Sequence, residues 1–345
     1  MKRGTLIILV VLIALVAVAV YLLRSGAGAS SIEKADRDFL IKDTASITRI
    51  FLADKEGNSA EISREKSGWM VNKKFPCRSE AILNLFEAIR LMEVKMPVPR
   101  SAKENVIRFM SSNAVKVEIY SGDDKLKQYY IGHEPADSEG SYMILSKDDD
   151  ENYPDPYVVF IPGFKGYLQP RFITRENEWR DRLVLNFTPP QLKEIRVNYF
   201  DQAKDSSFTI EFQDQSHFTL KNTAGTEIPY DMGKMRQYLI YFQNISYESL
   251  ITAKSSRLLD SLNRSTPFAC INVLTKDQKT STYRFFRKAY TGEVNPELGV
   301  KFPYDPDRLF LNYDNNKEWA LIQYFVFGKL LITSGYFQPP ASVKK

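Results

Sequence analysis

The sequence contains few of the residues on which catalytic and metal chemistry most often depends. Only two histidines and two cysteines occur among 345 residues. The short motifs of zinc proteases, thiol oxidoreductases, serine hydrolases, phosphate-binding loops and dinucleotide-binding folds are all missing from the sequence. His133 and His217 stand in expected turns with no catalytic or metal-binding motif nearby. We therefore expect no catalytic residue, no metal and no cofactor, and we interpret the chain as a non-enzymatic protein.

Glycine and proline are also scarce, at 16 and 17 residues, which excludes a fibrous or disordered chain. A strong excess of positive charge is missing too. The formal net charge is +5, but Lys2, Arg3 and Arg24 flank an apolar segment, and without them 44 basic residues face 42 acidic ones. Nucleic-acid binding normally needs a clustered excess of Lys and Arg, so we exclude nucleic acid as a partner. Cys77 and Cys270 are expected to be small buried residues and not to form a disulfide.

One long apolar run lies at the N-terminus. Residues 6–23 are 18 residues without a charge, and a helix of that length spans roughly 27 Å, close to the thickness of the bilayer hydrocarbon. The apolar core of a cleaved signal peptide is shorter, at about 7 to 15 residues, although Ala-Gly-Ala at 27–29 would suit cleavage as the alternative. Lys2 and Arg3 favour a cytoplasmic N-terminus. The run predicts a single-pass signal anchor in a bacterial inner membrane, with the lipid bilayer as the partner of residues 6–23 and the body in the periplasm.

The rest of the sequence repeats a pattern of apolar positions at a nearly constant offset. Five helix-spaced positions, Ile82, Leu85, Phe86, Ile89 and Met92, recur 153 residues later as Met235, Tyr238, Leu239, Phe242 and Ile245. Three strand-spaced positions, Val115, Val117 and Ile119, recur 154 residues later as Ala269, Ile271 and Val273. A steady offset across a helix and a strand indicates an internal repeat.

Each repeat has the pattern of strands, two helices and further strands, with Ser79 and Ser101 at the expected starts of the first two helices. This order is typical of an α+β unit in which the helices cover one face of a mainly antiparallel sheet. We therefore predict an N-terminal transmembrane helix followed by two tandem α+β repeats with two helices each. The predicted boundaries are 1–31 for the cytoplasmic tail, anchor and tether, 32–165 for the first repeat, 166–182 for a connector and 183–345 for the second repeat.

Aromatic residues gather in and around the connector. The candidates for contact with a partner or a ligand are Tyr157, Phe164, Tyr167, Phe172 and Trp179. Exposed rings stack on sugars or anchor a partner protein, but packing of the two halves against each other is the favoured interpretation of these aromatics. Glu176 and Glu178 offer a pair of carboxylates for acid–base catalysis. Ion pairs across the junction between the two halves, formed with the neighbouring arginines, are the favoured interpretation of these charges.

Two segments resemble a known bacterial family. They are the tryptophan-containing strands with the following helix over 39–92, and the phrase PYVVFIPGFKGYLQPRFITRENEWRDR at 156–182. Both are similar to the bacterial domain of unknown function 4340 family, in the form found in Bacteroidota, and the resemblance covers about residues 39–331. It implies a membrane-anchored envelope protein, some members of the family being encoded beside gliding-motility-type ABC transporter components. The family has no agreed active site, so the resemblance assigns no functional residue.

Together these patterns predict a membrane-anchored extracytoplasmic interaction or accessory subunit of a cell-envelope complex, linked to a gliding-motility-type ABC transporter, with envelope or transporter proteins as partners. Two alternatives stay open. One is a module that binds envelope glycan or another ligand through the connector aromatics. The other is an enzyme of undetected class that uses the connector carboxylates.

Overall fold

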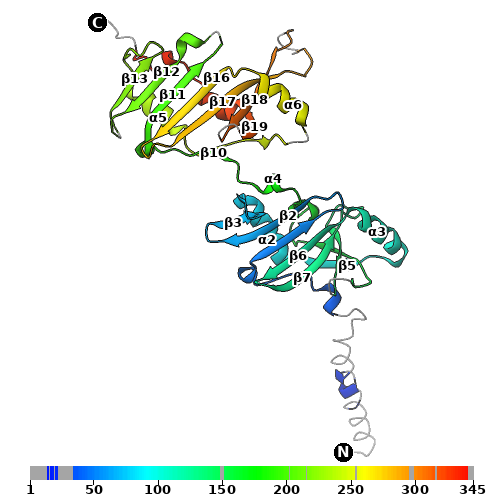
Figure 1. The fold of residues 1–345 in the computed structure, drawn as a ribbon. Coiled ribbons are helices and arrows are strands. Elements are labelled where there is room, and N and C mark those ends of the chain that lie inside the picture. Colours follow the sequence, from blue (N-terminus) through cyan, green and yellow to red (C-terminus); the bar gives the residue numbers. More distant parts are fainter. Residues whose placement is uncertain are drawn as a thin grey trace, which may run out of the picture. The chain divides into compact units, whose positions relative to one another are not determined.

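The computed structural model (Figure 1) describes residues 14, 16–18, 20, 21, 34–147, 151–201, 203–214, 216–252, 255–294, 299–314 and 317–340. The chain divides into two compact units, Met1–Asp181 and Arg182–Lys345. The predicted anchor and tether lie outside the described residues, apart from helical positions 14, 16–18, 20 and 21. Within the described part of the chain, no helix combines the length and the apolar character needed to cross a bilayer.

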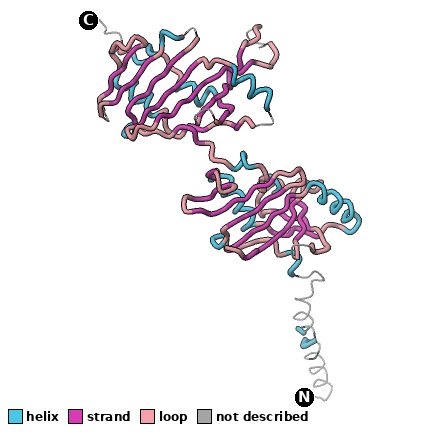
Figure 2. The backbone as a smooth tube through the Cα atoms, in the orientation of Figure 1, coloured by secondary structure: helices cyan, strands magenta, loops and turns pink. Residues whose placement is uncertain are grey.

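The first unit is built on a nine-stranded antiparallel sheet with helices beside it (Figure 2). Its strands are β1 (Arg49–Ala53), β2 (Ser59–Glu65), β3 (Gly68–Val71), β4 (Phe75–Pro76), β5 (Glu93–Pro97), β6 (Val115–Ser121), β7 (Asp124–Ile131), β8 (Ser141–Leu145) and β9 (Tyr157–Phe160). Its α-helices are α2 (Ser79–Leu91), α3 (Arg100–Asn113) and the short α4 (Glu176–Trp179). The order across the sheet is β4-β3-β2-β1-β6-β7-β8-β9-β5.

Helices α2 and α3 cover opposite faces of this sheet. In β9, Tyr157 and Val159 belong to the core cluster that includes α2, whereas Val158 between them packs with Val106 and Met110 of α3. Successive residues of a strand point to opposite faces, so the two helices lie on different sides. The prediction that the helices cover one face is therefore wrong. Helix periodicity shows which side of a helix is buried, but it does not show which face of a sheet receives that side.

The predicted helix starts are close to those in the structure. Helix α2 begins at Ser79 itself, and α3 begins at Arg100, one residue before Ser101. The expected capping by the serines is wrong, because the cap residues are Arg78 and Pro99, and neither makes a side-chain capping hydrogen bond. Proline supplies a backbone angle that suits the start of a helix without a polar cap, and this accounts for the error at α3.

The second unit has an eight-stranded antiparallel sheet and a small two-stranded sheet. Its strands are β10 (Leu183–Leu185), β11 (Leu192–Tyr199), β12 (Phe208–Phe212), β13 (Phe218–Asn222), β14 (Ile245–Ser246), β15 (Ser249–Leu250), β16 (Ala269–Thr275), β17 (Thr280–Ala289), β18 (Tyr304–Tyr313) and β19 (Glu318–Gln323). Its α-helices are α5 (Met232–Ile240), α6 (Ser256–Arg264) and α7 (Tyr324–Phe327). The order of the large sheet is β13-β12-β11-β16-β17-β18-β19-β15, and β10 pairs with β14.

The two large sheets follow the same succession of strands. The order β3-β2-β1-β6-β7-β8-β9-β5 in the first unit has its counterpart, strand for strand, in the order of the second. At the centre, Leu52 faces Val117 across β1 and β6, and Val197 faces Ile271 across β11 and β16. All four side chains are fully buried. The mixed α+β class with mainly antiparallel sheets is thus confirmed.

Each unit ends in a segment that returns from its last strand to the start of its first helix. We call residues 161–181 and 324–340 the closing segments. The carbonyl oxygen of Trp179 accepts a 2.8 Å hydrogen bond from the N–H of Arg78, and that of Phe337 accepts a 2.7 Å bond from the N–H of Asp231. Residues 166–181 of the predicted connector therefore belong to the first unit.

Candidate functional site

The five aromatic residues proposed as contacts lie in two different environments. Tyr157, Phe172 and Trp179 are fully buried in the core of the first unit. The Trp179 ring N–H donates a 2.8 Å hydrogen bond to the carbonyl oxygen of Ile173, so even its polar atom is used internally. Phe164 and Tyr167 are partly exposed, at 38% and 37%. Of the five, only these two are exposed enough to touch a ligand or a partner.

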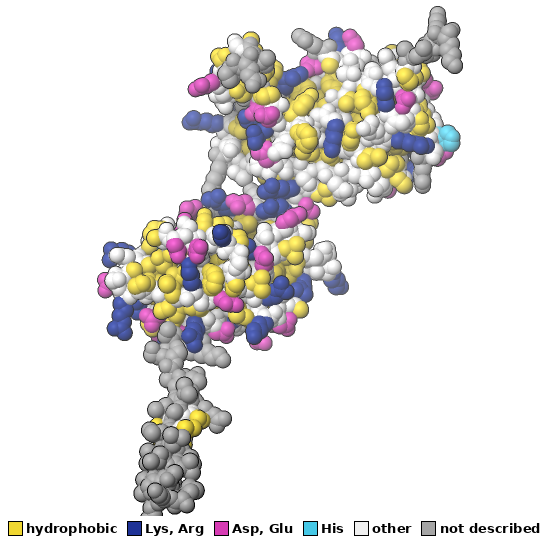
Figure 3. Space-filling view, turned by 180° about the vertical axis from the view of Figure 1, so that it is seen from behind, with side chains coloured by type: hydrophobic (Ala, Val, Ile, Leu, Met, Phe, Trp, Pro, Cys, Tyr) yellow, Lys and Arg dark blue, Asp and Glu magenta, His cyan; other side chains and the backbone are white. Residues whose placement is uncertain are grey.

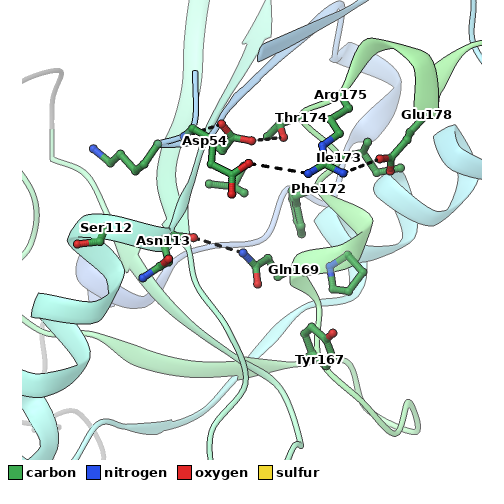
Figure 4. A pocket seen from close by; sticks show the side chains of 14 residues that line it. Asp54, Ser112, Asn113, Tyr167, Gln169, Phe172, Ile173, Thr174, Arg175 and Glu178 are labelled. Atoms are coloured by element: carbon green, nitrogen blue, oxygen red, sulfur yellow. Dashed lines mark hydrogen bonds and ion pairs between the residues drawn. The ribbon is translucent and has the colours of Figure 1, made fainter. Parts of the chain in front are cut away.

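Tyr167 and Phe172 line an open cleft of about 590 Å³ in the first unit (Figure 4). Three segments surround it: the turn after β1, the end of α3 with the start of β6, and the closing segment. Its lining residues are Asp54, Lys55, Glu56, Ser112, Asn113, Val115, Tyr167, Gln169, Pro170, Phe172, Ile173, Thr174, Arg175 and Glu178. These segments meet because β1 and β6 are neighbours in the sheet and the closing segment runs back over their ends.

Asp54 fixes the turn at one end of the cleft. One carboxylate oxygen accepts 2.9 Å hydrogen bonds from the N–H groups of Glu56 and Asn58. The other accepts bonds from the side chains of Thr174 at 2.6 Å and Asn58 at 2.8 Å. Partial burial acts to raise the pKa of Asp54, but these four hydrogen bonds outweigh it and hold the pKa below its ordinary value. The carboxylate is therefore a structural anion that ties the closing segment to the turn.

Arg175 carries the positive charge beside Asp54. Its guanidinium lies 3.5 Å from a carboxylate oxygen of Glu178 and 3.8 Å from one of Glu56. All three side chains are about half exposed or more, so water screens these pairs and each stabilises the fold little. Glu176, the other member of the predicted carboxylate pair, does not line the cleft; it accepts a 2.6 Å hydrogen bond from the side chain of Asn72.

Amide and hydroxyl groups line the opposite side of the cleft. Ser112 and Asn113 end helix α3, and the amide nitrogen of Gln169 donates a 3.4 Å hydrogen bond to the backbone oxygen of Asn113. Figure 4 shows the Gln169 side chain pointing toward Asn113, with Tyr167 beyond it. Sequence reasoning missed these residues because they are ordinary polar residues 56 positions apart. No local pattern marks such a pair as neighbours.

Arg171 and Arg180 of the closing segment make contacts within the first unit. Arg171 pairs with Glu87 of α2, and its guanidinium also lies 4.5 Å from the centre of the Phe164 ring. Arg180 lies over the Phe75 ring at 3.7 Å. These contacts lie inside one unit and are not the pairs across a domain junction that the charged run predicts.

The second unit has a smaller cleft, of about 330 Å³, at the corresponding place in its own topology. It lies where β11 ends beside the C-terminal end of α6. Arg287 lies there with its guanidinium 4.5 Å from the centre of the Phe268 ring and 5.1 Å from that of Tyr304. It also contacts the carboxylate of Asp201 at 2.6 Å. Burial acts to raise the pKa of Asp201, but its backbone hydrogen bond and Arg287 lower it overall.

One side chain of the second unit is unusually exposed. Phe325 in helix α7 is 92% exposed, whereas Phe327, two residues later, is fully buried. Ile240 at the end of α5 is 61% exposed, and next to it the ring of Tyr241 lies 5.1 Å from the ammonium of Lys329. Figure 3 shows hydrophobic side chains on the second unit gathered among Lys and Arg side chains. We call helix α7 with its exposed Phe325 the α7 patch.

The described residues form no metal-binding site and contain two free thiols. No group of three His, Cys, Asp or Glu side chains among the described residues is placed to hold a metal ion. Cys77 and Cys270 are free thiols, and burial raises the pKa of both. The nitrogen Nδ1 of His133 is buried with no hydrogen-bond partner; its ring lies against that of Phe109, 3.9 Å between centres.

Comparison with known proteins gives one match. Residues 72–261 match the model of a family described as Domain of unknown function (DUF4340). No curated protein and no solved structure matches the chain.

Proposed function

Because this chain belongs to the DUF4340 family, for which no activity is described, we propose a function from its residues: a membrane-anchored interaction subunit of a bacterial cell-envelope complex. In this proposal residues 6–23 span the inner membrane, the N-terminus is cytoplasmic and both units lie in the periplasm. The Bacteroidota origin and the link to a gliding-motility-type ABC transporter are parts of the same proposal.

The observation that carries the proposal is the exposure of Phe325. A phenylalanine exposed at 92% leaves most of its apolar surface in water, which is unfavourable by roughly 25 cal/mol per Å². Aromatic side chains are enriched at the centres of protein interfaces, where a pocket on the partner removes them from water. Lys329, four positions after Phe325, lies with its ammonium over the ring of Tyr241, so the segment that follows Phe325 also carries a cation for such a contact.

The arrangement of the chain supports a scaffold of this kind. We propose that the two units are tandem repeats, each an α+β module with its own closing segment. The shared succession of strands and the matching bonds of Trp179 and Phe337 support this proposal. Two modules on one anchor would present two surfaces to one membrane complex.

The test is purification of the full-length chain from its native membrane in mild detergent, followed by quantitative mass spectrometry. We expect envelope or transporter subunits in stoichiometric amounts with the wild type and their loss with Phe325→Ser. Phe164→Ser, which alters a partly exposed ring of the first unit, is the control and should retain them. Recovery of the wild type alone would contradict the interaction proposal.

A second preparation tests the anchor. Deletion of residues 1–31 should move the chain from the membrane pellet to the soluble fraction. Sedimentation with membranes after this deletion would show that residues 6–23 are not what holds the chain there.

A further inference from the structure

We propose that the cleft of the first unit binds an uncharged oligosaccharide, with Tyr167 stacking on a sugar ring and Gln169, Asn113 and Ser112 pairing with its hydroxyl groups. This site lies in the first unit, away from the α7 patch of the second. It therefore adds a ligand to the proposed interaction function and does not depend on it.

The size and openness of the cleft suit a chain-like ligand. A volume of about 590 Å³ falls within the range of roughly 300–1,000 Å³ that is common for small-molecule sites. The cleft is open to solvent along the surface and is not an enclosed cavity. A ligand that continues beyond the site at both ends, as a polysaccharide does, is compatible with that shape.

Tyr167 supplies the apolar platform. Its side chain is 37% exposed, and among the described residues its hydroxyl has no hydrogen-bond partner. The flat face of a pyranose ring presents C–H groups that pack against an aromatic face, while the phenol remains able to donate to and accept from a sugar hydroxyl.

The polar groups have the chemistry that vicinal hydroxyls require. A side-chain amide places a donor and an acceptor side by side, so Gln169 can pair with two neighbouring hydroxyls. The amide nitrogen of Asn113 already donates a 3.2 Å bond to the carbonyl oxygen of Phe109, and its amide oxygen can accept from a third hydroxyl. Gln169 is held in place because its backbone N–H donates a 3.3 Å bond to the hydroxyl of Ser141. Its contact to Asn113 is long, at 3.4 Å, and a ligand hydroxyl can replace it without leaving a buried amide unpaired.

The charge of the cleft selects against anionic ligands. Its lining contains three carboxylates, Asp54, Glu56 and Glu178, and two cations, Lys55 and Arg175. Arg175 is shared between the two glutamates, so its charge is already balanced. The net negative charge of the lining would repel a phosphate or a uronate. Neutral sugar hydroxyls can instead donate hydrogen bonds to the carboxylate oxygens of the lining.

The test is isothermal titration calorimetry of the full-length chain in detergent. The probes are chitotetraose, maltotetraose and, as the anionic comparison, a tetramer of galacturonic acid. We expect measurable binding of at least one neutral tetrasaccharide and none of the galacturonate. Tyr167→Ala and Gln169→Ala should each weaken that binding at least tenfold, while Phe164→Ala, with a similar exposure in the same segment, should change it less than twofold.

Three results would overturn the proposal: no heat with either neutral probe at millimolar concentration, galacturonate binding as tight as the neutral probes, or unchanged affinity in both cleft variants. Because Tyr167 and Gln169 lie at the surface, both variants should keep the wild-type melting temperature. The α7-patch variant Phe325→Ser should bind the saccharide normally, so failure of one proposal is separable from failure of the other.

Discussion

The hydroxyl of Thr174 donates a 2.6 Å hydrogen bond to the carboxylate of Asp54, 120 positions earlier in the chain. This bond joins the closing segment to the turn after β1, at the end of the strand that occupies the centre of the sheet. Thr174 itself is buried. The bond therefore determines both the position of the closing segment and the shape of one wall of the cleft.

Asp54→Asn should lower the stability of the first unit by roughly 1 kcal/mol or less, since the four hydrogen bonds that the carboxylate accepts are lost or weakened and solvent screens the site. The folded-state pKa of Asp54 lies below its unfolded value. Its stabilising effect is therefore present above the unfolded pKa and is lost as the pH falls through the folded pKa. Urea unfolding at pH 7 and pH 3 should show a larger wild-type advantage at pH 7 than at pH 3. Glu104→Gln, on the exposed side of α3, is the control and should not change the free energy of unfolding at either pH. If the wild type were more stable than Asp54→Asn by the same amount at pH 7 and pH 3, the charge of Asp54 would not have this role.

Trp179→Ala should destabilise the first unit by about 3–5 kcal/mol, because a fully buried indole is replaced by a cavity. Phe164→Ala, also in the closing segment but partly exposed, should change stability by much less. Thermal unfolding followed by tryptophan fluorescence and circular dichroism measures both. A melting temperature unchanged by Trp179→Ala would mean that the ring is not a core residue.

Truncated fragments test whether the first unit ends at residue 165 or at residue 181. A fragment of residues 32–181 contains Leu168, Phe172 and Trp179, all of which are buried in its core, and should unfold cooperatively. A fragment of residues 32–165 lacks all three and should be unfolded or aggregate. Equal stability of the two fragments would show that residues 166–181 form a connector outside the core.

Thiol reactivity tests the burial of Cys77. Burial raises the pKa of its thiol to about 12, so very little reactive thiolate is present at pH 8. Reaction with a disulfide reagent should be slow in the native protein and fast in urea, with Cys270 behaving in the same way. Rapid native labelling would contradict the environment described for these residues.

Part of this fold could be predicted from the sequence. The spacing of Ile82, Leu85 and Ile89 identifies α2, because one helical face must be buried. The alternation of Val115 and Val117 identifies β6, because alternate residues of a strand point to the same, buried face of the sheet. The faces covered by α2 and α3 could not be predicted, since this choice depends on the order of strands across the sheet.

The sequence of 166–182 predicts a connector because it lies between two similar patterns and is rich in charge. One signal points the other way: Ile173-Thr174 recurs 159 positions later as Ile332-Thr333, and such a recurrence favours a segment that belongs to each half. The cleft had no such signal. Asp54, Asn113 and Gln169 become neighbours only through strand pairing and chain return, which leave no short-range pattern.

The place of Trp179 has a consequence for folding during synthesis. Phe39 and Trp179 lie in the same core of the first unit, yet they are 140 positions apart and stand near its two ends. A chain that emerges from a ribosome or a translocation channel with its N-terminus first cannot complete this core until Trp179 has emerged. Until then the apolar faces of β1 and β6 have no finished covering, so the unit depends on delayed folding or on a chaperone for longer than a module with only local contacts.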